Sequence, residues 1–197
     1  MATTTEMIKQ LRELTQAGVL DCKRALEETG GDLAKAAEYL KEKGLTAAAK
    51  KASRSAADGR IEAYVHPGDK LAALVEVNCE TDFVARTEAF RAFCHDVAMQ
   101  VAAVAPRWVS RADIPEAELA AIKAGFAQEA AEGNKPTHIV EKIVEGKLDK
   151  FCAEACLLEQ PFVKDDTKTV QQLLTEVIAK LGENVKIARF ARFQIQS

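Results

Sequence analysis

Residues 78–86 have the sequence Asn-Cys-Glu-Thr-Asp-Phe-Val-Ala-Arg, and they lie where the hydrophobic period of the chain changes. The preceding run, residues 71–77, is apolar and has the length and β-branched content of a strand. In the following segment, residues 90–101, apolar side chains recur at intervals of three and four, which is typical of a helix. The sequence therefore predicts a strand-to-helix loop that carries Phe83 beside Asp82.

The pattern alone leaves two interpretations of this loop open. In the first, Asp82 caps the following helix and Phe83 packs onto the core as a hydrophobic staple. In the second, the loop presents Phe83 to water, where an aromatic side chain held between two regular elements can act as a wedge in a partner protein.

Upstream of the loop, the first 45 residues predict three short helices with brief turns. The sequence from Thr3 to Glu6 has the form of a capping box, Gly18 and Gly30-Gly31 separate the apolar stripes, and Asp32 can cap a third helix that ends before Gly44. Such a bundle has a small core. Val19 and Leu20 therefore either lie exposed for a partner or pack inward.

Residues 45–58 are rich in Ala, Lys and Ser and predict a solvated helical connector, with a domain boundary near Ala52. Beyond it, residues 61–65 alternate, Pro67-Gly68-Asp69 turns the chain, and residues 71–77 return, which predicts a β-hairpin.

The downstream half predicts mainly helices. One helix starts at Pro115 and ends at residues 133–136. A second apolar face, at residues 139–144, is interrupted at Gly146, and a further helix follows over residues 148–158. Residues 161–168 predict a loop, and residues 170–181 predict an amphipathic helix that Gly182 closes. Residues 185–195 predict a packed terminal strand. The fold class is α+β: a helical head, residues 1–52, followed by a mixed helix and antiparallel-sheet core, residues 53–197.

Composition limits the function classes. The 197 residues are 48% hydrophobic and 29% charged, as in an ordinary soluble globular protein, and the net charge of -3 argues against broad nucleic-acid or anionic-membrane binding. The chain has no run long enough to span a membrane and no signal-peptide core, so we expect a cytoplasmic protein.

Catalytic and metal chemistry have little support in the sequence. We find no nucleophile elbow, P-loop, Gly-rich dinucleotide loop or zinc-binding spacing, which predicts a protein that is not an enzyme and holds no metal or cofactor. Five cysteines without a CxxC pair indicate a reducing compartment. Cys152 and Cys156 are one helical turn apart, and core packing is favoured over metal binding.

Three runs resemble the signatures of one family. Thr81-Asp-Phe-Val-Ala85, Thr15-Gln-Ala-Gly-Val-Leu-Asp-Cys-Lys-Arg-Ala-Leu26 and Leu157-Leu-Glu-Gln-Pro-Phe-Val-Lys164 are similar to runs in elongation factor Ts, the nucleotide exchange factor of elongation factor Tu. The family usually has two Met residues where this chain has Val19 and Leu20. The resemblance implies a ubiquitin-associated-like head and a short bacterial form with one core subdomain.

The resemblance also implies a function and its residues. Thr81, Asp82, Phe83 and Val84 would insert into GDP-bound elongation factor Tu and displace its magnesium ion, leaving a nucleotide-free complex. Arg12, Val19 and Leu20 would hold a helix of the same GTPase domain, the core would hold the partner's third domain, and two chains would form a homodimer. The alternative is an adaptor whose head binds a ubiquitin-like protein; such heads usually present Met-Gly-Phe/Tyr where this chain has Ala17-Gly18-Val19.

Overall fold

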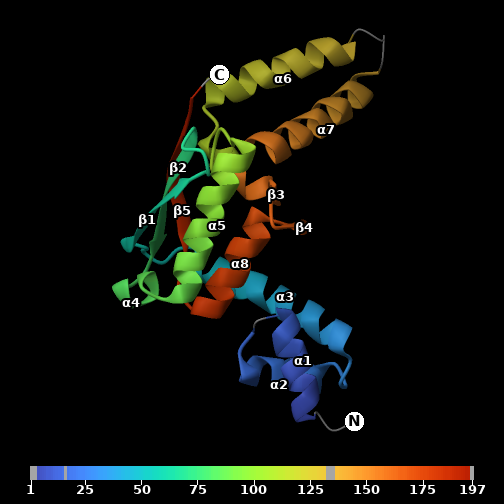
Figure 1. Cartoon of the computed structure of the whole chain (residues 1–197). Helices are drawn as coiled ribbons and strands as arrows, with labels where there is room; N and C mark the ends of the chain where they lie inside the picture. Colours follow the sequence, from blue (N-terminus) through green and yellow to red (C-terminus); the bar gives the residue numbers. More distant parts are fainter. Residues whose placement is uncertain (1–3, 16, 132–135, 196–197) are drawn as a thin grey trace. The chain divides into compact units, whose positions relative to one another are not determined.

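The computed structural model of the chain describes residues 4–15, 17–131 and 136–195 (Figure 1). Helices alternate with short strands in these residues, which confirms the predicted α+β class. The chain forms two compact units: Met1–Ile61, Glu76–Cys94 and Gln172–Ile187 make the first, and Glu62–Val75, His95–Gln171 and Ala188–Ser197 make the second. The first unit includes residues on both sides of Ala52, and the predicted domain boundary there stays a prediction.

The head consists of helices α1 (Thr5–Thr15), α2 (Val19–Glu28) and α3 (Leu33–Lys51). Their apolar faces enclose a small core of five fully buried residues, Leu11, Cys22, Ala25, Leu26 and Ala36. The predicted caps are partly confirmed. Asp32 accepts hydrogen bonds from the N–H groups of Ala34 (3.0 Å) and Lys35 (3.1 Å), whereas Thr3 lies outside the described residues and the Thr4 hydroxyl accepts from Met7 N (3.3 Å).

The third helix differs from the prediction, because it continues through Gly44 to Lys51. A Cβ at Gly44 would lie 3.6 Å from the Cβ of Ala179, an ordinary packing distance. Residues 45–51 are helical, as predicted for the connector, whereas residues 52–57 contain no helix.

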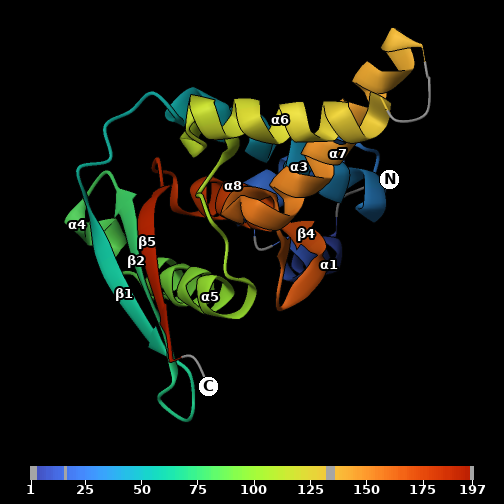
Figure 2. The ribbon, with the colours of Figure 1, turned by 90° about the horizontal axis from the view of Figure 1, so that it is seen from above.

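Strands β1 (Asp58–Val65), β2 (Leu71–Cys79) and β5 (Lys186–Gln194) form one sheet in the order β1-β2-β5 (Figure 2). The predicted hairpin is confirmed: His66 N donates to Leu71 O (2.8 Å), and Gly68 and Asp69 take positive φ angles in the turn. Gly59 has φ +149°, and a Cβ there would lie 2.2 Å from Val77 O, so only glycine fits. The predicted terminal strand is also confirmed.

After β2 the chain forms a short helix, α4 (Asp82–Ala85), and then α5 (Glu88–Val104). The inward face of α5 is that predicted from the spacing: Phe90, Phe93, Cys94, Val97, Ala98 and Val101 are buried. Helix α8 (Val170–Leu181) ends as predicted at Gly182, which has φ +77° and donates to Ile178 O (3.0 Å).

In the second unit, α6 (Glu116–Ala131) and α7 (Thr137–Ala155) form a helical hairpin (Figure 1). The predicted interruption at Gly146 is wrong, because α7 passes through it without a break. The predicted loop at residues 161–168 is also wrong, because β3 (Pro161–Phe162) pairs with β4 (Asp165–Thr169) as a small antiparallel hairpin. Short 3-10 turns at Arg111–Asp113 and Leu157–Glu159 precede α6 and β3.

Among the helices in the described ranges, none is both long enough and apolar enough to cross a membrane.

Candidate functional site

The predicted loop begins with Thr81, which is the N-cap of α4. Its backbone is extended (φ -134°, ψ 153°), and its hydroxyl oxygen accepts from Val84 N. Asp82 is the first helical residue, and its carboxylate pairs with Arg86 at 2.9 Å on the exposed face of the turn. The prediction that Asp82 caps the helix is therefore wrong by one residue.

The exposure of the side chains in α4 decides between the two interpretations of the loop. The buried residue of α4 is Ala85, whereas the Phe83 side chain is 81% exposed. A staple residue would be buried against the core. The structure therefore excludes the staple interpretation and shows a large aromatic ring in water, with half-buried Val84 beside it.

Thr81 itself is held through each of its polar atoms. Its N–H donates to Glu183 Oε2 (3.0 Å) and its hydroxyl to Glu183 Oε1 (2.6 Å). Its carbonyl oxygen accepts from Ala85 N (3.2 Å) and from the Cys79 thiol (3.2 Å). Burial, followed by the charges of Glu183 and Asp58, raises the pKa of Cys79 to about 11, so the thiol keeps the proton that it donates.

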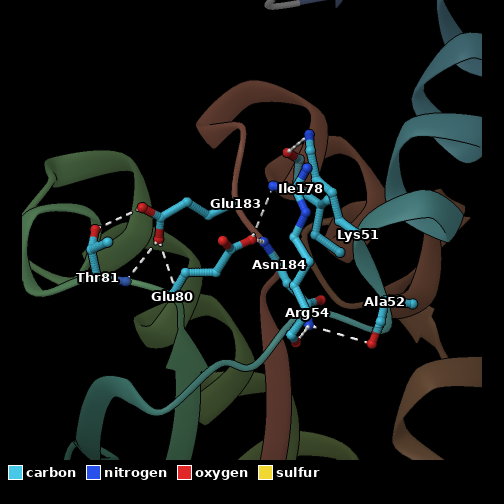
Figure 3. Close-up of polar contacts among 8 residues, drawn as sticks. All are labelled: Lys51, Ala52, Arg54, Glu80, Thr81, Ile178, Glu183 and Asn184. Atoms are coloured by element: carbon cyan, nitrogen blue, oxygen red, sulfur yellow. Dashed lines mark hydrogen bonds and ion pairs between the residues drawn. The ribbon is translucent and has the colours of Figure 1, made fainter.

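The turn around Glu183 is held in return by Glu80 (Figure 3). Glu80 N donates to Glu183 Oε2 (3.0 Å), while Glu80 Oε1 accepts from Asn184 N (2.6 Å) and lies 3.5 Å from the Arg54 guanidinium. Each carboxylate therefore holds the backbone of the other turn. Because the partners lie about a hundred positions apart, the loop is fixed to a distant part of the chain.

A third segment joins this network at the end of α3. The side chain of Asn184, which is only 7% exposed, donates to the carbonyl oxygens of Arg54 (2.8 Å) and Ala52 (3.5 Å). Lys51 Nζ donates to Ile178 O (3.5 Å) nearby. Sequence reasoning did not identify Glu80, Arg54, Glu183 or Asn184. Gly182-Glu183-Asn184 is recognisable in sequence only as a turn, and nothing in it indicates which loop it meets.

The second predicted set of site residues lies on the head. Val19 and Leu20 open α2 after Gly18, and they are 51% and 77% exposed; Leu14 on α1 is 71% exposed and Arg12 is exposed as well. The interpretation in which the pair packs inward is thereby excluded. The structure brings Thr81, Asp82, Phe83 and Val84 together in one turn and gives the head a separate apolar surface.

The Cys152 and Cys156 pair belongs to a buried cluster with Ile114, which confirms the predicted core packing. Their sulfur atoms and a Glu159 oxygen lie within 4.8 Å of one another. Burial, followed by the charges of Cys152 and Glu159, raises the pKa of Cys156 to about 12, so this thiol is protonated at neutral pH. The Glu159 carboxylate is also bound by Arg111 at 2.5 and 2.6 Å.

An exposed aromatic on a fixed loop and a separate exposed apolar patch are features typical of proteins that bind other proteins. Comparison with known proteins specifies the class further. The family model described as Elongation factor TS matches residues 2–197. The chain belongs to the elongation factor Ts family, and so to the translation elongation factors.

Individual relatives agree over nearly the whole chain. Elongation factor Ts of Herpetosiphon aurantiacus is 52% identical over 197 residues, which is all of both chains. The protein of the same name from Carboxydothermus hydrogenoformans is 54% identical over 192 residues, covering 98% of this chain and 88% of its own. That from Heliobacterium modesticaldum is 52% identical over 192 residues, covering 98% and 89%.

Proposed function

We propose that this chain is the guanine nucleotide exchange factor for elongation factor Tu and acts in the cytoplasm during translation elongation. It promotes GDP release by inserting the loop Thr81–Val84 beside the magnesium and phosphate site of the GTPase. It performs no covalent chemistry of its own, because GDP release requires only that the binding of the nucleotide by elongation factor Tu be weakened.

The observation that carries this proposal is the exposed Phe83 on a turn fixed by Glu183. A rigid aromatic that becomes buried at an interface contributes roughly 2–4 kcal/mol as a hot-spot residue. Each tenfold gain in release rate needs about 1.4 kcal/mol off the barrier. One inserted ring is therefore sufficient for a rate increase of roughly 30-fold to several hundredfold, provided that its full contribution is realised in the transition state.

The charge of Asp82 supports the same site. GTPases hold the nucleotide through its phosphates, the magnesium ion and the amides of the P-loop. A carboxylate brought next to that ion competes for it or repels the phosphates. Asp82 already has Arg86 as a partner, 2.9 Å away, which keeps this exposed carboxylate in a fixed position on the turn.

The head serves as a second docking surface. Leu14, Val19 and Leu20 are exposed together with Arg12, a combination suited to an amphipathic helix on the partner. Docking by the head holds the exchange loop at its target, whereas the loop changes the nucleotide site. Because coupling is reciprocal, the nucleotide weakens binding of this chain by the same factor. The complex with nucleotide is therefore transient, and GDP or GTP separates the partners.

The test is release of fluorescent GDP from elongation factor Tu, measured with and without this chain. We expect release to accelerate in proportion to the chain at low concentration and then to saturate. The assay repeated in excess chelator removes the metal-dependent part of the acceleration. Unchanged GDP release at tens of micromolar of this chain would exclude the exchange function.

We also propose a homodimer, formed through one face of the sheet. In the second unit, Tyr64 contacts His95 of α5, Arg192 donates to Ala102 O of α5, and Ala73 and Val75 are buried. Because side chains alternate along a strand, their neighbours point to the opposite face. We call that opposite surface the open face; it carries Val65, Leu74, Phe193 and Ile195, which are 44–65% exposed. Four large apolar side chains in water favour association with a second copy.

A further inference from the structure

We propose that Glu183, in the turn between α8 and β5, is a positioning residue for nucleotide exchange: it sets the direction of Phe83 by holding Thr81. This inference rests on the proposed exchange function and adds a residue that lies about a hundred positions away from the loop in sequence. Glu183 itself need not touch the partner.

The contact set of Glu183 is unusually complete for a half-buried side chain. One carboxylate oxygen accepts from two successive amides, Glu80 N and Thr81 N, both at 3.0 Å. The other oxygen accepts the Thr81 hydroxyl at 2.6 Å. Successive N–H groups that converge on one oxygen form a small anion-binding concavity. Bonds from such groups to a carboxylate are roughly twice as strong as neutral ones.

These bonds act on Phe83 because of where Thr81 lies. Helix α4 has four residues, which is too short to be stable by itself, so its orientation depends on how its ends are fixed. Thr81 is the hinge: its extended backbone turns into the helix, and Phe83 follows two residues later. The bonds from Thr81 to Glu183 therefore restrain the start of α4, and with it the direction in which the aromatic ring leaves the protein. Buried Ala85 and the Thr87 bond to Val84 O (2.8 Å) restrain the end of the helix.

Loss of Glu183 is not expected to unfold the chain. Thr81 is exposed, so water can replace the lost partner of its N–H and hydroxyl. The turn at residues 183–184 keeps independent anchors, because Asn184 N still donates to Glu80 (2.6 Å) and Asn184 Nδ2 to Arg54 O (2.8 Å). The expected consequence is a loop that samples several directions on an intact fold. Such a loop has a lower exchange rate rather than a weaker fold.

The experiment compares Glu183→Ala and Glu183→Gln with Glu141→Ala, a matched control at an exposed glutamate on α7. We expect Glu183→Ala to lower the maximal rate of GDP release about tenfold, with the half-saturating concentration within about twofold. The melting temperature should fall by at most a few degrees, because three bonds to a carboxylate are lost at a partly exposed turn. Glu183→Gln should recover most of the rate, because its amide oxygen still accepts from both N–H groups. The control should behave as the unmutated chain does.

Two further readouts separate positioning from a general structural effect. Amide hydrogen exchange should accelerate at Glu80 and Thr81 in Glu183→Ala, while protection in α5 and α8 stays unchanged; this measurement needs no partner. In a double-mutant cycle, Glu183→Ala should have little further effect on a Phe83→Ala background, because Glu183 acts through that ring.

The outcomes distinguish the two proposals. Full-rate exchange by Glu183→Ala, when Phe83→Ala is slow, overturns the role of Glu183 and leaves the exchange function standing. A rate loss of equal size with and without the Phe83→Ala change also overturns it. So does a rate loss that is accompanied by faster amide exchange throughout α5 and α8, because that would show a general loss of structure. Absence of any stimulation by the unmutated chain overturns the exchange function itself, whatever the amide protection shows.

Discussion

At the level of single residues, the site depends on a hydroxyl where the sequence indicated a carboxylate. Capping by Asp82 and capping by Thr81 fit the same local pattern, since both residue types are good N-caps. In the structure Thr81 is the N-cap, and its hydroxyl also makes a contact that local sequence does not contain, the bond to Glu183 (2.6 Å). With Thr81 as the N-cap, Asp82 is the first helical residue and Ala85 is the buried residue of α4, while Phe83 is exposed.

Phe83→Ala is the sharpest test at this scale. We expect GDP release at saturating concentration to slow by roughly 30-fold, since losing a hot-spot aromatic costs about 2 kcal/mol or more. The melting temperature should stay within about 2 °C of that of the unmutated chain, because the ring is 81% exposed and contributes little to packing of the core.

A buried phenylalanine would behave differently, since its truncation costs about 3–5 kcal/mol of stability. Phe90, which is fully buried on α5, supplies that comparison: Phe90→Ala should melt much earlier than Phe83→Ala. If Phe83→Ala also melts early, yet exchanges GDP at full rate well below its melting point, the ring is a structural staple after all.

At the level of elements, the sequence predicted the helices and strands whose own residues mark where they start and end. Helix α8 has an apolar stripe and Gly182, and the β1–β2 hairpin has alternation and Gly68-Asp69, so both were predictable. Gly146 was misleading, because an interior glycine costs only about 1 kcal/mol relative to alanine. Contacts with α6 offset that cost: Phe151 packs edge-on against Phe126, and Lys147 pairs with Glu129.

The β3–β4 hairpin was missed for a related reason. Its sequence is short and polar, which predicts a loop, and its strands are stabilised from α5. The fully buried Gln100 side chain donates to Pro161 O (3.1 Å) and accepts from Val163 N (2.8 Å). A strand held by a side chain about sixty residues away leaves no mark in its own sequence.

Removing the head tests whether the head supplies docking and the loop supplies exchange. The deletion ends at Lys51, because Ala52 and Arg54 supply carbonyl groups to Asn184 and must be retained. We expect the half-saturating concentration in a GDP-release titration to rise at least tenfold while the maximal rate changes little. The physical reason is that exposed Val19 and Leu20 supply docking area, whereas the loop supplies exchange.

Point variants control for the deletion. Leu20→Asp places a charge in the docking surface without shortening the chain and should shift half-saturation in the same direction. Unchanged half-saturation in both the deletion and the point variant would show that the head is not a docking surface.

At the level of the whole molecule, the sequence predicted the α+β class and the residues of the loop but not the network that fixes it. The hydrophobic period, the capping residues and the turn residues are local features of the sequence, so they specify individual helices and strands. The reciprocal bonds between residues 80–81 and 183–184 arise only when distant turns meet. The pattern of residue types in a single sequence does not show which distant turns come into contact.

The buried thiols predict how stability responds to alkaline pH. Burial raises the pKa of Cys79 to about 11 and that of Cys156 to about 12, from an ordinary value of 9.0. The folded state therefore favours the neutral thiols. Their contribution is complete below pH 9 and is lost as pH rises from 9 toward 11 and 12, on the order of 1 kcal/mol per thiol for each pH unit.

Urea unfolding at pH 8 and pH 10.5 under reducing conditions measures this loss. Lysines and tyrosines also titrate in that range, so Cys156→Ala is compared with the unmutated chain. The variant should be less stable at pH 8 but lose less stability between the two pH values. Equal losses in the two proteins would exclude a role for the Cys156 thiol.

The open face leads to the last prediction, which concerns self-association. Edge strands and exposed apolar side chains both favour pairing with another copy, and β1 and β5 are the outer strands of the sheet. We expect a dimeric mass by sedimentation at tens of micromolar. Phe193→Asp places a charge in this apolar surface and should give a monomer, because an unpaired carboxylate is costly to bury. Gln194→Asp is the matched control, since the next residue along a strand points to the other face. A monomer in the unmutated chain contradicts the prediction, as does a dimer that persists in Phe193→Asp.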